Sequence, residues 1–270
     1  MQKVILITGS TDGIGLETAK NLVSQGHHVL IHGRSQTKLA DVEMMLKTLP
    51  GSGTVESYIA DLSRLADVIS LAEAITAKHK KLDALINNAG VYNVSQVVST
   101  DNLDVRFMVN TIAPYLLTQR LLPLLDGESR IVNLSSAAQS PVNLKSLVGP
   151  NVAAADGAVY AQSKLALTMW SLHMARQLNE QGPAVIAVNP ASFLGSKMVK
   201  EAYGMAGGDL SIGADILCAA ALSQEFANAS GKYFDNDTGQ FTSPHPDALH
   251  VVNCQQLVAA IETILAKKLN

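Results

Sequence analysis

Six short apolar runs alternate with longer helix-period segments, and this alternation is the strongest constraint on the fold. The runs are VILIT (4–8), HHVLIH (27–32), VESYIA (55–60), LDALIN (82–87), RIVNLS (130–135) and AVIAVN (184–189). We expect helices between and after them, near 14–25, 36–49, 64–80, 102–125 and 158–180. Strands that are apolar on both faces and separated by helices are typical of a parallel sheet covered on both sides. The pattern therefore predicts an α/β fold with a doubly wound parallel sheet in a three-layer sandwich.

Composition excludes several classes of protein. The formal net charge of −3 gives no electrostatic reason to expect nucleic acid or an anionic membrane as a partner. No apolar run reaches the ~18–20 residues of a membrane-spanning helix. Cys218 and Cys254 are too few for a disulfide framework and lack metal-ligand spacing, so we expect a cytoplasmic protein. His28 and His32 lie four apart on an expected strand and do not converge, so we expect structural histidines and no metal site.

A glycine-rich turn follows the first expected strand. Gly9, Gly13 and Gly15 open the next helix with the spacing Gly-x3-Gly-x-Gly. Gly9 allows a tight turn, Gly13 lets the backbone approach a pyrophosphate at the helix N-terminus, and Gly15 lets the helix pack closely on the sheet. Ordinary strand-to-helix turns also carry glycines, but this position at the first strand–helix junction favours a dinucleotide site.

Residues at the end of the second strand bear on which dinucleotide is bound. Folds that prefer NAD usually place an acidic residue there for the ribose hydroxyls. This chain has Gly33 and Arg34 instead, with Lys38 one turn later, and a guanidinium suits a 2′-phosphate. We therefore expect NADP(H) to be favoured over NAD(H); the alternative is that Arg34 is a solvated residue before the next helix. After the third strand, Asp61 either meets the adenine amino group or caps the following helix.

Tyr160 and Lys164 lie four apart in AVYAQSKLALTMW (158–170), a segment otherwise nearly all apolar or small. On a helix they share one face. A free tyrosine has a pKa of about 10, and an ammonium close by in a poorly solvated cleft favours the phenolate and lowers that pKa. Such a tyrosine exchanges a proton with a carbonyl or an alcohol, and the glycine turn would bind the hydride donor. The alternative is a core tyrosine beside a snorkelling lysine.

Two further segments supply polar groups. Ser135 and Ser136 end the fifth strand, where a hydroxyl either polarises a substrate carbonyl or caps a helix. In VNTIAPYLL, Pro114 removes the helical partner of the Asn110 carbonyl. We expect that carbonyl to accept from a water or from the Lys164 ammonium; a plain proline kink is the alternative.

Taken together, these motifs resemble the short-chain dehydrogenase/reductase family. They are TGSTDGIG, NNAG (87–90), Asn110, SS (135–136), YAQSK (160–164) and the NP of VNPASFLGSKM (188–198), in the family order over almost the whole chain. Ser136 and Tyr160 are 24 residues apart (160 − 136), which resembles the retinol-dehydrogenase-like branch, as does GKYFDNDTGQFTSPHPDAL (231–249). The resemblance implies one NAD(P)-binding Rossmann-type domain over 1–270, with GKYF as a final strand and 253–267 as a last helix.

The resemblance also implies a site. The tetrad would be Asn110, Ser136, Tyr160 and Lys164, with Lys164 also holding the nicotinamide ribose and NNAG lining the adenosine side. The expected cofactor-binding residues are Gly9, Ser10, Thr11, Asp12, Gly13, Ile14, Gly15, Arg34, Asp61, Leu62, Asn88, Ala89, Gly90, Tyr160, Lys164, Pro190, Ser192 and Ser196. The chain departs from the family where Pro190-Ala191 replaces the usual Pro-Gly and Ser196 replaces a threonine.

The expected function is hydride transfer between NADP(H) and a ketone or aldehyde, or the corresponding alcohol, with Tyr160 as general acid or base. The alternatives are an NAD-dependent alcohol dehydrogenase of the same family and a non-enzymatic dinucleotide-sensing regulator. A sugar-nucleotide epimerase would want a longer C-terminal domain. The lack of Gly-x-Ser-x-Gly removes an α/β-hydrolase.

The substrate pocket is expected in the least regular segments, 137–157 and 191–211, because ligands bind beyond the carboxyl ends of strands in open α/β sheets. Their apolar side chains either line a pocket for a medium-sized apolar carbonyl compound or pack the loops onto the sheet. They are Leu144, Leu147, Val148, Phe193, Leu194, Met198, Tyr203 and Met205. Helix 158–180, with Met169 and Trp170, either buries its outer face in a homodimer or homotetramer or belongs to the core.

Overall fold

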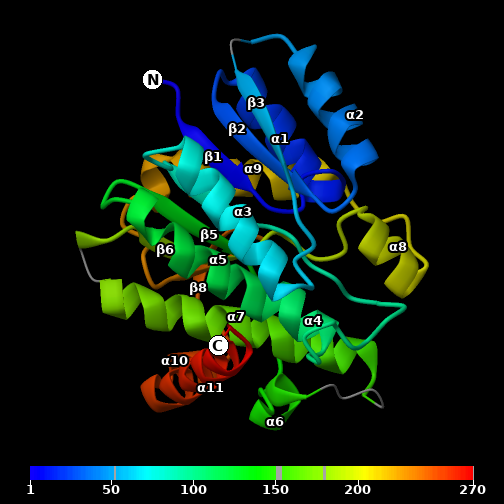
Figure 1. Ribbon diagram of the computed structural model, residues 1–270, viewed down its shortest axis with the longest axis vertical. Coiled ribbons are helices and arrows are strands. Elements are labelled where there is room, and N and C mark those ends of the chain that lie inside the picture. Colours follow the sequence, from blue (N-terminus) through cyan, green and yellow to red (C-terminus); the bar gives the residue numbers. More distant parts are fainter. Residues whose placement is uncertain (52, 150–153, 179–180, 270) are drawn as a thin grey trace.

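The computed structural model describes residues 1–51, 53–149, 154–178 and 181–269, and these form an eight-stranded sheet between two layers of helices (Figure 1). The strand order is β3-β2-β1-β4-β5-β6-β7-β8, which confirms the doubly wound α/β fold. Strands β1 to β7 are parallel, and β8 is antiparallel to β7. The strands are β1 (Val4–Ile7), β2 (His28–Gly33), β3 (Thr54–Ile59), β4 (Ala84–Asn87), β5 (Arg130–Leu134), β6 (Ala184–Asn189), β7 (Tyr233–Asp235) and β8 (Gln240–Thr242).

Helices cover both faces of the sheet. The helices are α1 (Gly13–Ser24), α2 (Gln36–Lys47), α3 (Leu65–Lys78), α4 (Val105–Phe107), the π-helix η1 (Met108–Ile112), α5 (Ala113–Leu121), the 3₁₀ turn η2 (Leu122–Leu124), α6 (Leu144–Val148), α7 (Asp156–Leu178), α8 (Lys197–Tyr203), α9 (Leu210–Leu222), the 3₁₀ turn η4 (Gln224–Phe226), α10 (Pro246–Leu249) and α11 (Val251–Leu269). The core against one face is built with α1, α2 and α9, and the core against the other with α3, α5, α7 and α11.

Alternation along the strands explains why their sequences are apolar throughout. Leu6 of β1 faces one core, whereas Ile5 and Ile7 face the other, and all three are fully buried. Successive side chains of a strand point to opposite faces, so a strand covered on both sides needs apolar residues at every position. The same alternation repeats in β2, where Leu30 lies in the core that contains Leu6 and Ile31 lies in the core that contains Ile5 and Ile7.

Two local features differ from the sequence expectation. The single helix expected at 102–125 is broken into α4, the π-helix η1, α5 and a 3₁₀ turn. In the π-helix the Ala113 N–H donates to the Met108 carbonyl, five residues earlier, so the register of the helix changes just before Pro114. The sheet also ends in the antiparallel β8, which the pattern did not predict. The segments 137–157 and 191–211, expected to be irregular, contain the short helices α6 and α8, and residues 150–153 lie outside the described residues.

Helix α7 belongs to the core of the single chain. Trp170 is fully buried and Met169 is 4% exposed. Helix α11 packs against α7 on the side away from the sheet (Figure 1). The apolar character of α7 is therefore explained within one chain, and it gives no reason to expect an interface between copies. Among the described helices, none is long and apolar enough to cross a membrane.

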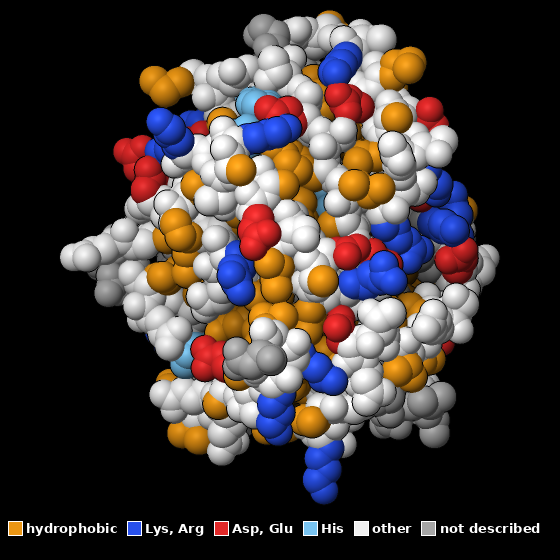
Figure 2. Space-filling model, in the orientation of Figure 1, with side chains coloured by type: hydrophobic (Ala, Val, Ile, Leu, Met, Phe, Trp, Pro, Cys, Tyr) orange, Lys and Arg blue, Asp and Glu red, His pale blue; other side chains and the backbone are white. Residues whose placement is uncertain are grey.

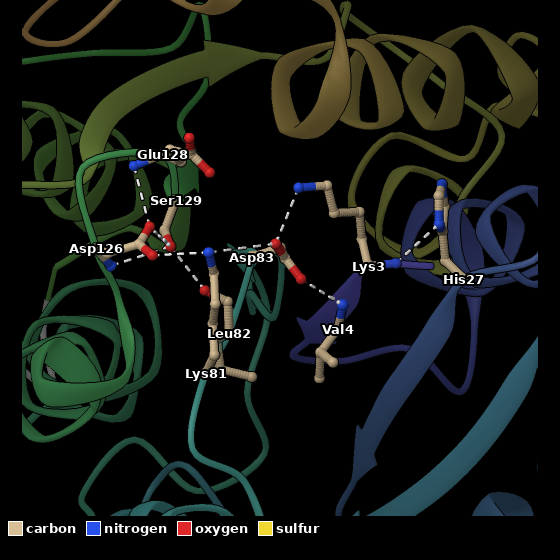
Figure 3. A network of polar contacts seen from close by, with 9 residues as sticks. All are labelled: Lys3, Val4, His27, Lys81, Leu82, Asp83, Asp126, Glu128 and Ser129. Carbon is tan, nitrogen blue, oxygen red and sulfur yellow. Dashed lines mark hydrogen bonds and ion pairs between the residues drawn. The ribbon is translucent and has the colours of Figure 1, made fainter. Parts of the chain in front are cut away.

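The amino edge of the sheet, where the parallel strands begin, is closed by a polar network (Figure 3). The Asp83 carboxylate, just before β4, accepts from the Val4 N–H at 2.8 Å and from Lys3 Nζ at 3.0 Å. Lys81 pairs with Asp126 at 2.7 Å beside it. Elsewhere on the surface, acidic and basic side chains are interspersed over the face shown in Figure 2.

Candidate active site

The glycine turn at the carboxyl edge, where the parallel strands end, is held by the segment after β4. Gly9 has φ +65°, and a Cβ there would lie 2.8 Å from the Ala89 Cα. A Cβ on Gly15 would lie 2.4 Å from Asn88 Nδ2, which donates to the carbonyls of Thr8 at 2.9 Å and Gly9 at 3.0 Å. Glycine is the residue that tolerates both the positive φ and the close approach. Asn88 and Ala89 were expected to line the adenosine side; the structure shows them bracing the turn.

A histidine that the sequence analysis read only as structural positions this turn. His32, at the end of β2, is 3% exposed, and its Nδ1 accepts from the Gly9 N–H at 3.1 Å. Its Nε2 therefore carries the proton and donates to the Ala60 carbonyl at 3.1 Å. Burial lowers the pKa of His32 to about 4, so the ring is neutral at pH 7. One imidazole thus joins the ends of β1, β2 and β3.

Helix α1 begins directly after the turn and presents a free N-terminus. The Asp12 carboxylate accepts from the Gly13 N–H at 2.7 Å, and the other first-turn N–H groups have no acceptor within the helix. A Cβ on Gly13 would have Ser196 Cβ as its neighbour, at 3.7 Å, so the segment after β6 reaches the turn. Ile14 packs against α9, where a Cβ on Gly213 would lie 3.1 Å from its Cγ2. First-turn N–H groups without an acceptor in the helix suit a pyrophosphate.

Some expected cofactor-binding side chains are used by the fold itself. Ser10 is fully buried, and its hydroxyl donates to the carbonyl of Ile7 and accepts from the His32 N–H at 2.8 Å. Asp61 accepts from the backbone and hydroxyl of Ser63, at 2.9 and 2.7 Å. It caps that turn and not helix α3, whose N-cap is Arg64. The Leu62 side chain is in the core.

Arg34 follows β2 at the carboxyl edge, is exposed, and makes no ion pair within the described residues. Lys38 lies one turn into α2 and is exposed as well. Thr11 of the glycine turn lies against Gly33, the residue before Arg34, since a Cβ on Gly33 would lie 2.6 Å from its Cγ2. Basic side chains without acidic partners are available to a phosphate.

The expected tetrad is brought together where α7 meets β5. Lys164 is 3% exposed, and its Nζ donates to the Leu134 carbonyl at 2.6 Å and lies 5.7 Å from the centre of the Tyr160 ring. Ser136, two residues after Leu134, hydrogen-bonds to Tyr160 through its side chain. The Ser135 hydroxyl is instead buried against Thr168 at 2.6 Å, so position alone favours Ser136 for a role at the site.

Electrostatics at the tetrad differ from the sequence expectation. Lys164 was expected to lower the pKa of Tyr160, but burial raises that pKa to about 12, and the Ser136 hydrogen bond opposes the rise. Burial also lowers the pKa of Lys164 to about 8. Desolvation disfavours each charged form, and it outweighs the attraction between them. The Tyr160 phenol is therefore protonated at neutral pH in the ligand-free protein.

The Asn110 side chain holds the segment after β4. Its Oδ1 accepts from the Val91 N–H at 2.8 Å, and its Nδ2 donates to the Val91 carbonyl at 2.9 Å and to Ser163 Oγ at 2.9 Å. Of the two donors expected for the Asn110 carbonyl, Lys164 donates to the Leu134 carbonyl instead, and a water stays a prediction. The side chain nevertheless stays near the ammonium, since a Cβ on Gly90 would lie 3.5 Å from both Asn110 Oδ1 and Lys164 Nζ.

A chain of aromatic ring contacts leads away from Tyr160. Tyr92 stacks at a tilt on Tyr160, with ring centres 4.9 Å apart, and lies 5.7 Å from Tyr203 of α8. Phe193 in turn lies 5.3 Å from Tyr203. The sequence analysis placed Phe193 and Tyr203 in a pocket segment but missed Tyr92, whose signal is its position two residues after NNAG. Of the other pocket candidates, Leu147 and Leu194 are buried in the fold, while Val148 and Met205 are exposed.

The segment after β6 is held by the turn between β7 and β8. Asp237 accepts from the Ser192 N–H at 2.7 Å and from its hydroxyl at 2.6 Å. Asn236 Nδ2 donates to the Pro190 carbonyl at 3.0 Å. The Ser192 side chain therefore contacts this turn, and its role in cofactor binding stays a prediction. Ala191, where the family has glycine, adopts φ +113°, a conformation that favours glycine.

The residues present fit a dinucleotide. Lys164 has three N–H donors and one acceptor among the described residues, and a buried ammonium with donors to spare suits ribose hydroxyls. The open first turn of α1 suits the pyrophosphate, and Arg34 suits a phosphate beyond it. Nicotinamide, when bound, supplies or accepts the hydride.

Comparisons with known proteins agree with this arrangement. A family model described as short chain dehydrogenase matches residues 3–206. Polyprenol dehydrogenase from Homo sapiens is 35% identical over 193 residues, which cover 68% of this chain and 58% of that protein, less than two thirds of its length. Retinol dehydrogenase 12 from Mus musculus is 32% identical over 247 residues, covering 87% of this chain and 78% of that protein. The crystal structure of the angucycline C-6 ketoreductase LanV with bound NADP has a TM-score of 0.67 and 27% identity, covering 87% of this chain and 93% of that chain.

Proposed function

This chain belongs to the short-chain dehydrogenase/reductase family, and on that premise we propose that it works with NADP(H) and uses Tyr160 as its general acid or base. Family membership makes it an oxidoreductase that acts on an alcohol or a carbonyl compound with a nicotinamide cofactor. The proposal adds the choice of cofactor, the role of each residue and the class of substrate.

The observation that carries the proposal is the buried Lys164 beside Tyr160. An ammonium that is 3% exposed, with one carbonyl as acceptor, costs stability unless it serves a ligand. Its position under Gly90 and next to the phenol suits a cation that binds ribose hydroxyls while it assists proton transfer. A purely structural lysine would be expected to reach solvent or a carboxylate.

In the direction of reduction, the Tyr160 hydroxyl donates its proton to the substrate oxygen as the carbonyl carbon gains the hydride. The pKa of about 12 keeps this hydroxyl protonated at neutral pH, as an acid must be. The Ser136 hydroxyl donates a hydrogen bond to the same oxygen and stabilises the developing charge. Lys164 stabilises the phenolate left behind, and Asn110 keeps the Val91 segment in place beside it.

The choice of NADP(H) rests on Arg34 and Lys38. Both are exposed; Arg34 directly follows β2, where an NAD-specific site would carry a carboxylate, and Lys38 lies in the first turn of α2. An unpaired guanidinium there suits a 2′-phosphate bidentately. The LanV structure, which shares 27% identity with this chain, holds NADP, in line with this choice.

The proposed substrate is an apolar aldehyde or ketone, or its alcohol. Tyr92, Tyr203 and Phe193 form an aromatic wall beside Tyr160, and such walls bind apolar ligands. Polyprenol and retinol, named in two relatives, are apolar alcohols. We also propose a cytoplasmic location, in line with two buried free cysteines, and a homodimer or homotetramer formed through a face other than the one that α11 covers.

Fluorescence titration with NADPH and with NADH at matched salt tests the cofactor choice. We expect tighter binding of NADPH, and Arg34→Ala weakens it by about tenfold, the loss of one charge-assisted phosphate contact. Lys47→Ala is the matched control, because Lys47 lies at the other end of α2 and pairs with Glu43. Equal affinity for both cofactors, or no effect of Arg34→Ala, contradicts the NADP(H) assignment.

A further inference from the structure

Two histidines and a glutamate converge at the amino edge of the sheet, on the opposite side from the candidate active site. His28 is the first residue of β2, Glu56 lies on the edge strand β3, and His79 is the C-cap of α3. One ligand atom from each lies within 4.8 Å of the other two. His28 and His79 are 51 positions apart in the sequence (79 − 28), so the sequence pattern did not show that they meet.

We propose that His28, Glu56 and His79 bind a divalent cation of the zinc type. Two imidazole nitrogens and one carboxylate form a common ligand set for zinc. None of the three belongs to the glycine turn or the tetrad, so this site is distinct from the proposed function.

The distances agree with the geometry that zinc imposes. His28 Nε2 lies 3.2 Å from Glu56 Oε1, and His79 Nε2 lies 3.4 Å from Glu56 Oε2. Tetrahedral zinc with metal–ligand bonds of about 2.0–2.1 Å places neighbouring ligand atoms about 3.3 Å apart. Each histidine therefore stands near this separation from one of the two carboxylate oxygens, and a bound zinc would draw together three ligand atoms that now lie within 4.8 Å of one another.

The surroundings orient the carboxylate and leave room for a further ligand. The Tyr58 hydroxyl donates to Glu56 Oε2 at 3.0 Å, the kind of outer contact that fixes a metal-binding carboxylate. It also lies 3.1 Å from His79 Nε2, so it can move with that ring or join the ligands. Lys78 Nζ lies 3.7 Å from Glu56, but its side chain is 64% exposed and free to swing into solvent when a cation binds.

The consequence of binding would be structural. The cation would tie the end of α3 to β2 and the edge strand β3, which are already paired with each other in the sheet. A cation that binds the folded state and not the unfolded state raises the melting temperature. Because the carboxyl edge is remote, cofactor affinity should not change.

The test uses full-length, tag-free protein stripped with a chelator. Titration with ZnCl2 against a chromophoric chelator gives affinity and stoichiometry, and CoCl2 gives the visible absorption bands of tetrahedral cobalt. We expect one equivalent of zinc, tetrahedral cobalt bands and a higher melting temperature. Glu56→Gln and His79→Gln should each weaken zinc binding by about tenfold or more.

His250→Gln is the matched control, because His250 is exposed and lies outside the cluster. It should leave zinc affinity unchanged, and NADPH titration of all variants reports whether they are folded. The proposal is overturned if the protein binds no zinc, or if Glu56→Gln and His79→Gln bind NADPH and keep the zinc affinity of the parent. A failure of NADPH binding in the parent protein would bear on the proposed function and not on this site.

Discussion

At the amino edge of the sheet, around Asp83, the polar groups hydrogen-bond to one another. At the carboxyl edge, some polar side chains keep N–H donors that have no acceptor among the described residues. Asp83 accepts from the Val4 N–H and from Lys3 in a closed network (Figure 3). Lys164, by contrast, is buried with one acceptor, and Arg34 has no ion pair among the described residues. Polar groups that are paired with one another contribute to the stability of the fold, and donors without a protein acceptor are available to a ligand. The Asp83 network thus serves the stability of the fold, whereas the side chains at the carboxyl edge are available to a dinucleotide.

Removing the Tyr160 hydroxyl should have the largest effect. Tyr160→Phe should lower kcat/KM for an apolar aldehyde by about 10²–10⁴-fold, the usual contribution of a general acid. NADPH affinity should stay within a few-fold, because the ring and Lys164 remain. Steady-state kinetics and the fluorescence titration measure the two effects. Tyr58→Phe, which removes a hydroxyl that contacts Glu56 and His79, is the matched control and should keep full turnover.

If Tyr160→Phe retains turnover within a few-fold of the parent, the acid–base assignment is wrong. If Tyr58→Phe loses turnover as well, the effect is not specific to Tyr160.

Acid should destabilise the carboxyl edge through His32. The folded-state pKa of His32 is about 4 and the ordinary value is 6.5, so the unfolded chain takes up a proton that the folded protein excludes. This contribution to the free energy of unfolding is fully present above pH 6.5. It is lost between pH 6.5 and 4, by about 3 kcal/mol over the 2.5 units.

His32→Gln tests this, because glutamine keeps one acceptor and one donor but does not titrate. Urea unfolding of both proteins at pH 7, 5 and 4 gives the difference in their free energies of unfolding, from which the other titrating groups cancel. The difference should shrink by about 3 kcal/mol as the pH falls from 7 to 4. A difference that stays constant would contradict the role of His32.

Breaking the amino-edge network should cost stability and leave catalysis alone. Asp83→Ala leaves the Val4 N–H without its acceptor and Lys3 without its partner, so the free energy of unfolding should fall by about 1–3 kcal/mol. The kcat should be unchanged in the folded fraction. The exposed Asp41→Ala is the control and should change stability by no more than about 0.5 kcal/mol. A fall in kcat for Asp83→Ala would show that the two edges are coupled.

The smallest expected effect is a gain of stability at the carboxyl edge. Ala191 has φ +113°, so Ala191→Gly relieves strain and should raise the free energy of unfolding by about 1 kcal/mol. Ala74→Gly, on the exposed side of α3, should lower it by about 1 kcal/mol. Chemical denaturation measures both. If the free energy of unfolding changes in the same direction in the two variants, backbone strain at Ala191 does not explain the change in Ala191→Gly.

Features that depend on neighbouring residues of the chain could be predicted from the sequence, and features that depend on contacts between distant segments could not. Strands such as VILIT and AVIAVN follow from burial on both faces, and Tyr160 and Lys164 follow from one helical spacing. Contacts between distant segments leave no periodic pattern in the sequence, so they could not be predicted. Examples are the contacts of Tyr92 with Tyr160, of His32 with Gly9 and of Asp237 with Ser192. The pKa of Tyr160 was predicted in the wrong direction, because sequence spacing shows the neighbouring charge but not the depth of burial. The π-helix just before Pro114 is a feature of backbone geometry that the sequence pattern did not show.

The turn between β7 and β8 limits how this chain can be recombined with its relatives. The family match ends at residue 206, yet Asp237 holds Ser192 and Asn236 holds the Pro190 carbonyl. A chimera that takes the residues after 206 from a relative would keep every motif of the glycine turn and the tetrad while losing these two anchors. Segment exchange in this protein should therefore treat 189–196 and 235–237 as one inherited unit, although about forty residues of chain separate them.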